Sequence, residues 1–275
     1  MVHTTLKAEG DDQQYLSQHP SNPQAYLAKT RPEPFEILSG TLSIGITTVN
    51  SGKCYSYYGI VDQERIANEA SRFIAENSDA KISDVENVVK EFISITSRHY
   101  GEEKLQFPQA AWFEIRMTKP TDEFTNKPRW HRDGRMYECE NVGDVNCKYA
   151  ITLLGNPTRI LKDSAFVVSV MEEEKTVKMP AYEHDEEAYW AAALKRGKLT
   201  GERMAGQPEI DVPNGSIIKF SWGQVDSPVH SEPDMSTDRV FITILYGRET
   251  EMKVMCEWRE KDYSCLLYTS DAADE

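Results

Sequence analysis

The chain has 275 residues, of which 39% are hydrophobic, so it is long and apolar enough for one large globular domain. Its 45 acidic and 31 basic residues give a net charge of −14 at pH 7. This balance argues against binding to nucleic acid or to an anionic membrane surface, because both need an excess of Lys and Arg.

The first part of the chain predicts an arm followed by two strands. Residues 1–34 are polar and contain four prolines, a composition that predicts an extended N-terminal arm. From Thr41 onward apolar and polar side chains alternate, which predicts a strand that ends at the turn Asn50-Ser51-Gly52. The aromatic and apolar residues of 55–60 indicate a returning strand.

Two amphipathic helices are predicted next. The first begins at Asp62, and the second begins with a capping box, Ser83-Asp84-Val85-Glu86. Each carries apolar residues on one face only, so we expect both helices to pack against the outside of a sheet.

Strands dominate the rest of the chain. A further helix is predicted at about 185–196, because acidic residues begin it, basic residues end it and Gly197 follows. Strands and helices do not alternate, which argues against a parallel α/β fold. The pattern predicts a mainly β, α+β fold with flanking helices and a double-sheet core of jelly-roll (cupin-like) type, which the family resemblance described below makes a double-stranded β-helix. The predicted strands are 111–118, 147–154, 165–170, 175–179, 216–222, 239–246 and 252–258.

A candidate metal site comes from residues far apart in the sequence. His131 and Asp133 form a His-x-Asp pair after a predicted strand, and His230 follows another predicted strand. Two imidazoles and one carboxylate can bind one face of Fe(II) and leave the opposite face open. Arg239 begins an apolar strand, where a guanidinium needs an anionic partner.

Other interpretations of these residues stay open. His131-Arg132-Asp133 also opens the catalytic loop of protein kinases, but that loop needs Asn where this chain has Glu138, and a glycine-rich loop and an Asp-Phe-Gly motif are missing. The simplest alternative is a pair of loop residues with His230 as a core histidine. A zinc-dependent hydrolase and a non-catalytic cupin-like binding module are the two functional alternatives.

The ordered set of His131, Asp133, His230 and Arg239 resembles the Fe(II)/2-oxoglutarate-dependent oxygenases. The resemblance covers a core of about residues 110–247 within a single domain of residues 35–265. It implies that the two histidines and the aspartate bind the iron and that Arg239 binds the far carboxylate of the cosubstrate 2-oxoglutarate.

The resemblance also implies further contacts and an activity. Lys148, Tyr149 and Thr152 lie on the next strand, where such enzymes often add a hydroxyl or a cation to the cosubstrate. The enzyme would use O2 and 2-oxoglutarate to oxidise, and most simply hydroxylate, a small-molecule or amino-acid-like substrate. Neighbours of the ligands in the sequence are the candidate substrate contacts, namely Trp130, Arg132, Arg135, Tyr137 and Trp222.

The remaining sequence features concern location and the chain end. No apolar run reaches the roughly 20 residues of a membrane helix, and the polar N-terminus has no hydrophobic stretch of a signal peptide. Five widely spaced cysteines are typical of reduced thiols, so we expect a cytoplasmic protein. Residues 266–275 are small, polar and acidic and are similar to translated sequencing adapters, so we expect a non-native or disordered tail. Nothing in the sequence indicates an oligomeric state.

Overall fold

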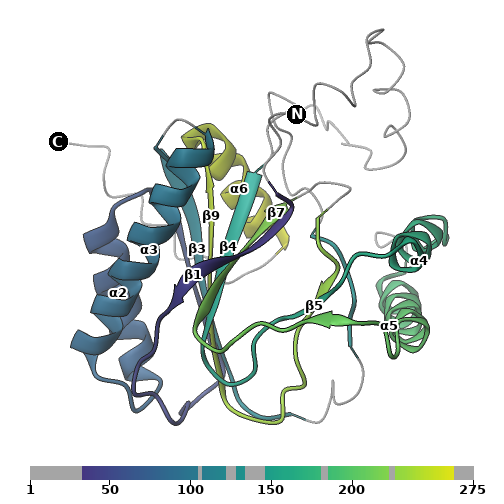
Figure 1. Cartoon of the computed structure of the whole chain (residues 1–275), viewed down its shortest axis with the longest axis horizontal. Coiled ribbons are helices and arrows are strands. Elements are labelled where there is room, and N and C mark those ends of the chain that lie inside the picture. Colours follow the sequence, from purple (N-terminus) through teal and green to yellow (C-terminus); the bar gives the residue numbers. More distant parts are fainter. Residues whose placement is uncertain are drawn as a thin grey trace, which may run out of the picture. The chain divides into compact units, whose positions relative to one another are not determined.

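Two antiparallel sheets form the centre of a computed structural model that describes residues 33–104, 107–121, 128–133, 146–180, 185–222 and 227–262. Within these residues the large sheet has six strands in the order β1-β7-β4-β9-β3-β2 (Figure 1). The small sheet has three, in the order β6-β5-β8, and an isolated antiparallel bridge joins His131 to His230 at its edge. The strands are β1 Phe35–Thr41, β2 Lys53–Ile60, β3 Ala110–Thr118, β4 Asn146–Leu154, β5 Arg159–Leu161, β6 Glu209–Ile210, β7 Ser216–Trp222, β8 His230–Ser231 and β9 Arg239–Gly247.

Helices α2 (Gln63–Glu76) and α3 (Ile82–Lys104) cover one face of the large sheet, which we call its outer face (Figure 1). Buried Ile66 and Phe92 of these helices share one core with Phe113 and Ile244 of the central strands. Burying an aliphatic or aromatic side chain of this size contributes roughly 1.5–3 kcal/mol. The amphipathic patterns of both helices therefore predicted their place correctly.

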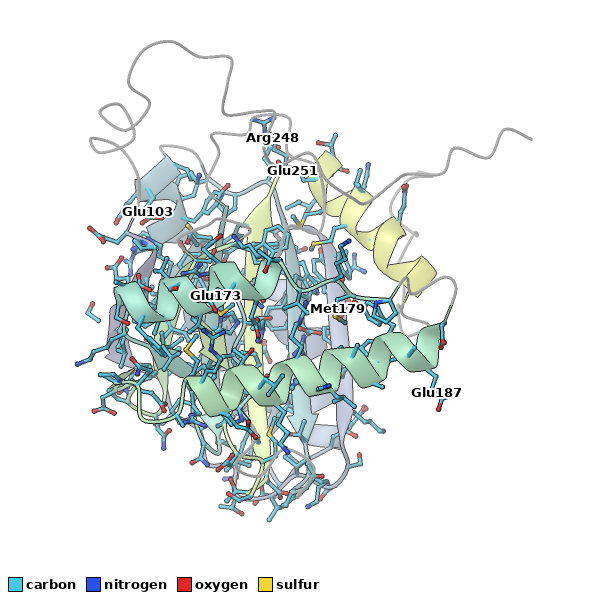
Figure 2. All side chains as sticks on the ribbon, turned by 90° about the vertical axis from the view of Figure 1, so that its right-hand side faces the viewer. Glu103, Glu173, Met179, Glu187, Arg248 and Glu251 are labelled. Carbon is cyan, nitrogen blue, oxygen red and sulfur yellow. The ribbon has the colours of Figure 1, made fainter. Side chains whose placement is uncertain are left out.

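The opposite, inner face of the large sheet packs against the small sheet. Ala150 and Phe220 of β4 and β7 share a core with Ile160 of β5 and with Val212. Helices α4 (Ala165–Lys175) and α5 (Glu186–Arg203) lie side by side beyond the small sheet, as Figure 2 shows. Helix α6 (Glu249–Asp262) packs at one end of the large sheet, against β2 and β3. The protein is thus mainly β with flanking helices, as the sequence predicted.

Several local predictions are confirmed. Strands β2, β3, β4, β7 and β9 form where the sequence predicted them. Asp62 caps α2 by accepting a hydrogen bond of 3.0 Å from the backbone N–H of Arg65. Gly215 has φ 75° in the turn before β7, and a Cβ at this position would collide with the carbonyl oxygen of Leu42.

The predicted strand from Thr41 to Asn50 is wrong, because the strand lies earlier, at β1. Residues 42–48 form no ladder. The backbone N–H groups of Thr47 and Thr48 instead donate to the carboxylate of Asp79 at 2.9 and 3.1 Å. The alternation there reflects Leu42 and Ile46 packing into the core without a neighbouring strand.

Two predicted strands, 165–170 and 252–258, are helices. Val167, Val170 and Met171 are the buried residues of α4, and buried Met252, Met255 and Cys256 of α6 have the same spacing. Valine-rich composition favoured strands, but contacts on one side only select the helical period of 3.6 residues.

Three further boundaries differ from the predictions. No strand forms at 175–179, where α4 ends. Helix α3 begins at Ile82, so Ser83 lies inside its first turn and contacts Asp84 rather than capping the helix. Helix α5 continues through Gly197 to Arg203, beyond the end that this glycine predicted.

The described residues from Glu33 onward belong to one compact unit. Nearly all of the predicted arm (1–34) and all of the predicted tail (266–275) lie outside the described residues. Among the described helices, none combines the length and the hydropathy that a bilayer crossing requires.

Candidate metal centre

Strand pairing brings His131 and His230 together. The backbone N–H of each histidine donates to the carbonyl oxygen of the other at 2.9 Å, so they are opposite residues of an antiparallel bridge. Opposite residues of such a pair project their side chains to the same face, and the two ring centroids lie 4.4 Å apart. Asp133, two residues after His131, joins them on that face.

The candidate ligand atoms of His131, Asp133 and His230, which we call the His-Asp-His cluster, all lie within 4.8 Å of one another. Oδ1 of Asp133 is 3.8 Å from Nε2 of His131 and 3.6 Å from Nε2 of His230. Ligands of one ion with bonds of about 2.1 Å stand roughly 3–4 Å apart. The donor set and its spacing therefore fit one divalent metal ion.

Both imidazole rings are oriented by backbone carbonyl groups. Nδ1 of His131 lies 2.7 Å from the carbonyl oxygen of Arg129, and Nδ1 of His230 lies 3.1 Å from that of Pro228. A carbonyl oxygen only accepts hydrogen bonds, so each Nδ1 carries the hydrogen and each Nε2 keeps its lone pair. Metal-binding histidines commonly use such a hydrogen bond from the nitrogen that does not bind the metal to fix their tautomer.

The electrostatic environment keeps His230 and Asp133 of the cluster deprotonated. Burial lowers the pKa of His230 to about 4, so this imidazole is neutral at pH 7. Burial alone would raise the pKa of Asp133, but the charges of Lys148, His230 and His131 together hold it well below its ordinary value. The side chain of His131 keeps 44% exposure, which leaves the site open to solvent on one side.

Lys148 is a cation in direct contact with the cluster. It lies on the inner face of β4, and its Nζ is 2.9 Å from Oδ2 of Asp133. The ammonium also lies over the rings of Trp112 and Phe220, at 5.8 and 5.5 Å from their centroids. It thus holds one carboxylate oxygen while the other faces the two histidines.

Arg239 is a buried cation on the same inner face. It is 4% exposed, donates to the carbonyl oxygen of Asn156 at 3.1 Å and to Oγ1 of Thr158 at 3.3 Å, and lies 4.2 Å from the ring centroid of Phe241. Burial lowers its pKa to about 10, so it stays charged at pH 7. Among the residues that the structure describes, no carboxylate lies within ion-pair distance of it. A buried charge of this kind calls for an anion.

Strand alternation separates the predicted cosubstrate contacts on β4, because Lys148 and Thr152 face one side and Tyr149 the other. Thr152 is buried on the inner face, in register with Phe241 of β9. Tyr149 points to the outer face, where its hydroxyl lies 3.0 Å from Nδ1 of His99. Tyr149 therefore faces away from the side of the sheet that carries Lys148, Thr152 and Arg239.

Of the predicted substrate contacts that the structure describes, Trp130 and Arg132 pack toward α4, whereas Trp222 shares the inner face of β7 with Phe220. Trp130 points away from His131 into the core shared with α4, and Trp222 packs against Met252 of α6. A terminal nitrogen of Arg132 lies 3.9 Å from Oε1 of Glu172 in α4. Successive residues of an extended segment face opposite sides, which explains why neighbours in sequence are not neighbours at the site. Arg135 and Tyr137 lie outside the described residues.

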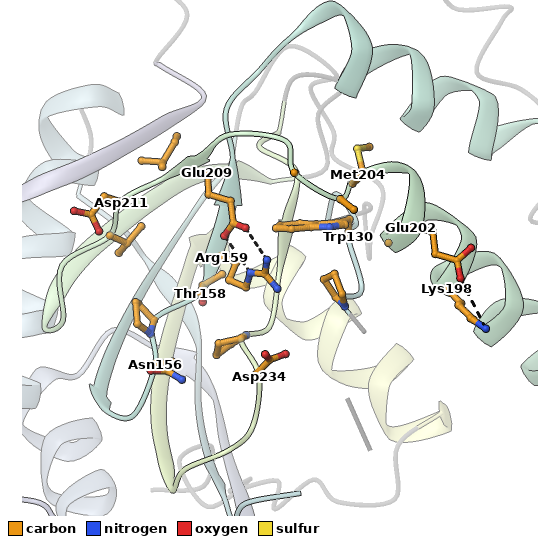
Figure 3. Close-up of a pocket in the computed structure, with 18 residues that line it drawn as sticks. Trp130, Asn156, Thr158, Arg159, Lys198, Glu202, Met204, Glu209, Asp211 and Asp234 are labelled. Atoms are coloured by element: carbon orange, nitrogen blue, oxygen red, sulfur yellow. Dashed lines mark hydrogen bonds and ion pairs between the residues drawn. The ribbon is translucent and has the colours of Figure 1, made fainter. Parts of the chain in front are cut away.

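A cavity of about 930 Å³ lies on the other side of the small sheet (Figure 3). Trp130 lines it, but none of the three cluster residues does. Arg159 lies over the Trp130 ring at 5.0 Å and forms two hydrogen bonds with Glu209, so its charge is already compensated. The His-Asp-His cluster therefore lies outside this cavity, whereas Asn156 and Thr158, the hydrogen-bond partners of Arg239, line it.

A second group of possible metal ligands, Glu36, His99 and Glu103, lies on the outer face of the large sheet. The buried ammonium of Lys219 contacts Glu103 and is 3.9 Å from Glu36. His99 is 3.3 Å from Glu36. Because a cation already lies between the carboxylates, this group is an ion-pair network.

Polar residues of the inner face that the sequence analysis did not select include Glu114, Arg116 and Thr243. The sequence did contain a signal for them, since charged residues at alternate positions of an apolar strand face the same side.

Comparison with protein-family models and with curated protein sequences finds no match for this chain.

Proposed function

We propose that the protein is a non-haem Fe(II) oxygenase that couples decarboxylation of 2-oxoglutarate to C–H oxidation of a small-molecule substrate. The His-Asp-His cluster carries this proposal, because both Nε2 atoms and Oδ1 of Asp133 converge on one point. Two histidines and one carboxylate are the ligands of non-haem Fe(II) oxygenases, in which the remaining positions stay open.

The order of the strands supports a double-stranded β-helix. From β3 onward the chain visits the large sheet (β3), the small sheet (the His131 bridge), the large sheet (β4), the small sheet (β5, β6), the large sheet (β7), the small sheet (β8) and the large sheet (β9). The paired orders are β7-β4-β9-β3 and β6-β5-β8-His131. This is the arrangement expected of an eight-stranded jelly roll, with β1 and β2 added at the edges of the large sheet.

Arg239 supports a dicarboxylate cosubstrate. Its guanidinium is buried with a backbone carbonyl and a hydroxyl as partners, and a carboxylate would complete its charge and its hydrogen bonds. Lys148 and Thr152 face the same side of the sheet and add a cation and a hydroxyl. Bound iron would supply the activation of O2, while the chain supplies the ligands, their orientation and the anion-binding cation.

The test is spectroscopic and chemical. Protein loaded anaerobically with Fe(II) and 2-oxoglutarate should show a visible charge-transfer band and, on exposure to O2, should release succinate. His131→Ala and His230→Ala should abolish both signals, whereas His99→Gln, a histidine on the outer face, should retain them. Wild type that shows neither signal contradicts the proposal and favours a zinc hydrolase or a cupin-like binding module.

A further inference from the structure

The polar residues Glu114, Arg116 and Thr243, which we call the Glu-Arg-Thr cluster, share the inner face of the large sheet with Lys148. Glu114 of β3 and Thr243 of β9 are register partners, and Ala150 of β4 is the next partner of Thr243. Their neighbours Phe113 and Ile115 pack on the outer face. Alternation therefore directs Glu114, Arg116 and Thr243 toward the small sheet.

The cluster lies between the two cations attributed to cosubstrate and metal binding. The inner-face residues of β9 run Arg239, Phe241, Thr243, Leu245, and Leu245 is the register partner of Lys148. At about 3.4 Å per residue, Thr243 is roughly 14 Å along the strand from Arg239 and roughly 7 Å from Leu245. A molecule bound at this row would lie along the part of the inner face between Arg239 and the candidate ligands, next to a cosubstrate that contacts both.

Among the residues that the structure describes, two polar atoms of this cluster are buried and lack a hydrogen-bond partner. The hydroxyl of Thr243, which is 1% exposed, has none. Oε2 of Glu114 is 3.0 Å from a terminal nitrogen of Arg116, so the two side chains form an ion pair. The orientation of the two groups nevertheless leaves Oε2 without a well-aligned hydrogen bond. Buried polar atoms in folded proteins are nearly always satisfied, so these two point to a missing partner.

Arg116 makes the cluster accessible. Its side chain keeps 40% exposure although Glu114 beside it is buried. It also belongs to the electrostatic environment of the site. Besides burial, the charge of Arg116 lowers the pKa of Arg239. A ligand that enters from the exposed side of Arg116 can therefore meet a guanidinium first and a carboxylate behind it.

From this geometry we infer that the Glu-Arg-Thr cluster binds the substrate and that the substrate is a free α-amino acid. This inference rests on the proposed oxygenase function. The ammonium group would bind Glu114, the α-carboxylate would bind Arg116, and the hydroxyl of Thr243 would donate to the same carboxylate. The ammonium and carboxylate groups of an amino acid sit on one carbon, and they match the neighbouring carboxylate of Glu114 and guanidinium of Arg116. A neutral terpenoid or aromatic compound would leave both of these side chains without a charged partner.

Calorimetric titration tests this inference through binding. Each of the twenty proteinogenic L-amino acids is titrated into metal-free protein and into protein loaded anaerobically with Fe(II) and 2-oxoglutarate. At least one should bind the loaded protein, and its α-amide and its deaminated acid should bind at least tenfold more weakly. If no amino acid binds either form, or if the deaminated acid binds equally well, the inference is overturned.

Variants then locate the binding site. Glu114→Gln and the double variant Glu114→Gln/Arg116→Gln should each weaken amino-acid binding at least tenfold. The double variant leaves no unpaired charge, so it should fold even where Arg116→Gln alone does not. Arg203→Met, which removes an exposed ion pair with Glu173 on the helical side, is the matched control and should bind normally. Full affinity in the double variant would overturn the assignment.

The outcomes separate this inference from the proposed function. If the protein releases succinate but no amino acid stimulates the release, the proposed oxygenase function stands and the proposed amino-acid site is rejected. If the protein binds an amino acid but neither binds 2-oxoglutarate nor shows the charge-transfer band, the binding role of the Glu-Arg-Thr cluster stands. The proposed oxygenase function is then rejected.

Discussion

Replacing Arg239 by Met should stabilise the ligand-free protein while it removes cosubstrate binding. Burial lowers the pKa of this guanidinium from 12.5 to about 10, and at about 1.36 kcal/mol per pKa unit the folded state bears roughly 3 kcal/mol for holding it charged. Met has a similar length and no charge. The variant loses hydrogen bonds to Asn156 and Thr158, each contributing about 1 kcal/mol. The net gain is therefore about 1 kcal/mol.

Thermal denaturation with and without 2-oxoglutarate measures both effects. For a chain of this size, 1 kcal/mol corresponds to a Tm change of roughly 2–4 °C, so ligand-free Arg239→Met should melt that much higher than wild type. A ligand at about 100 times its Kd stabilises the protein by about 2.7 kcal/mol. Wild type with Fe(II) and saturating 2-oxoglutarate should show this increase, and Arg239→Met should lose most of it.

Arg159→Met is the matched control, because Arg159 already forms an ion pair with Glu209 at 2.6 Å. It should lower the Tm slightly and leave the effect of 2-oxoglutarate unchanged. The reasoning is refuted if Arg239→Met melts several degrees below wild type without ligand, or if it keeps the full stabilisation by 2-oxoglutarate. In either case the guanidinium would be a satisfied structural group.

Three further predictions test the described structure. Ser164→Ala removes the cap whose hydroxyl accepts from the N–H of Val167, so chemical denaturation should show a loss of about 1 kcal/mol, whereas a strand at 165–170 predicts no such effect. Because the pKa of His230 falls from 6.5 to about 4 on folding, the unfolded chain takes up the proton first as pH decreases. Metal-free protein should therefore lose stability between about pH 6.5 and 4, by roughly 3 kcal/mol in a denaturation series, and constant stability over this range contradicts the burial of this imidazole. Burial raises the pKa of the Cys147 thiol to about 12, while Cys54 is exposed, so mass spectrometry after iodoacetamide treatment at pH 8 should find Cys54 modified and Cys147 protected. Rapid modification of Cys147 in folded protein would show that β4 is not buried.

The local sequence predicted those helices and strands in which the spacing of apolar residues matches the spacing of buried residues. Strands β3, β4, β7 and β9 are rich in aromatic and β-branched residues, and α2 has an aspartate cap and one apolar face. The residue types of His131, Asp133, His230 and Arg239 also predicted a chemistry, because few ligand sets combine two imidazoles, a carboxylate and a distant guanidinium.

Tertiary structure decided which side chains meet. The valines of 165–170 fit a strand or a helix, and only packing on one side selects the helix. Shifting the register of β4 by one residue would exchange Tyr149 for Lys148 at the inner face, and no local pattern fixes that choice. Trp130 adjoins a candidate ligand yet faces the opposite side, whereas Glu114 and Thr243 become neighbours through pairing across two strands. Sequence therefore determined the kinds of groups present, and long-range strand pairing determined their positions, since each strand offers its side chains alternately to two faces.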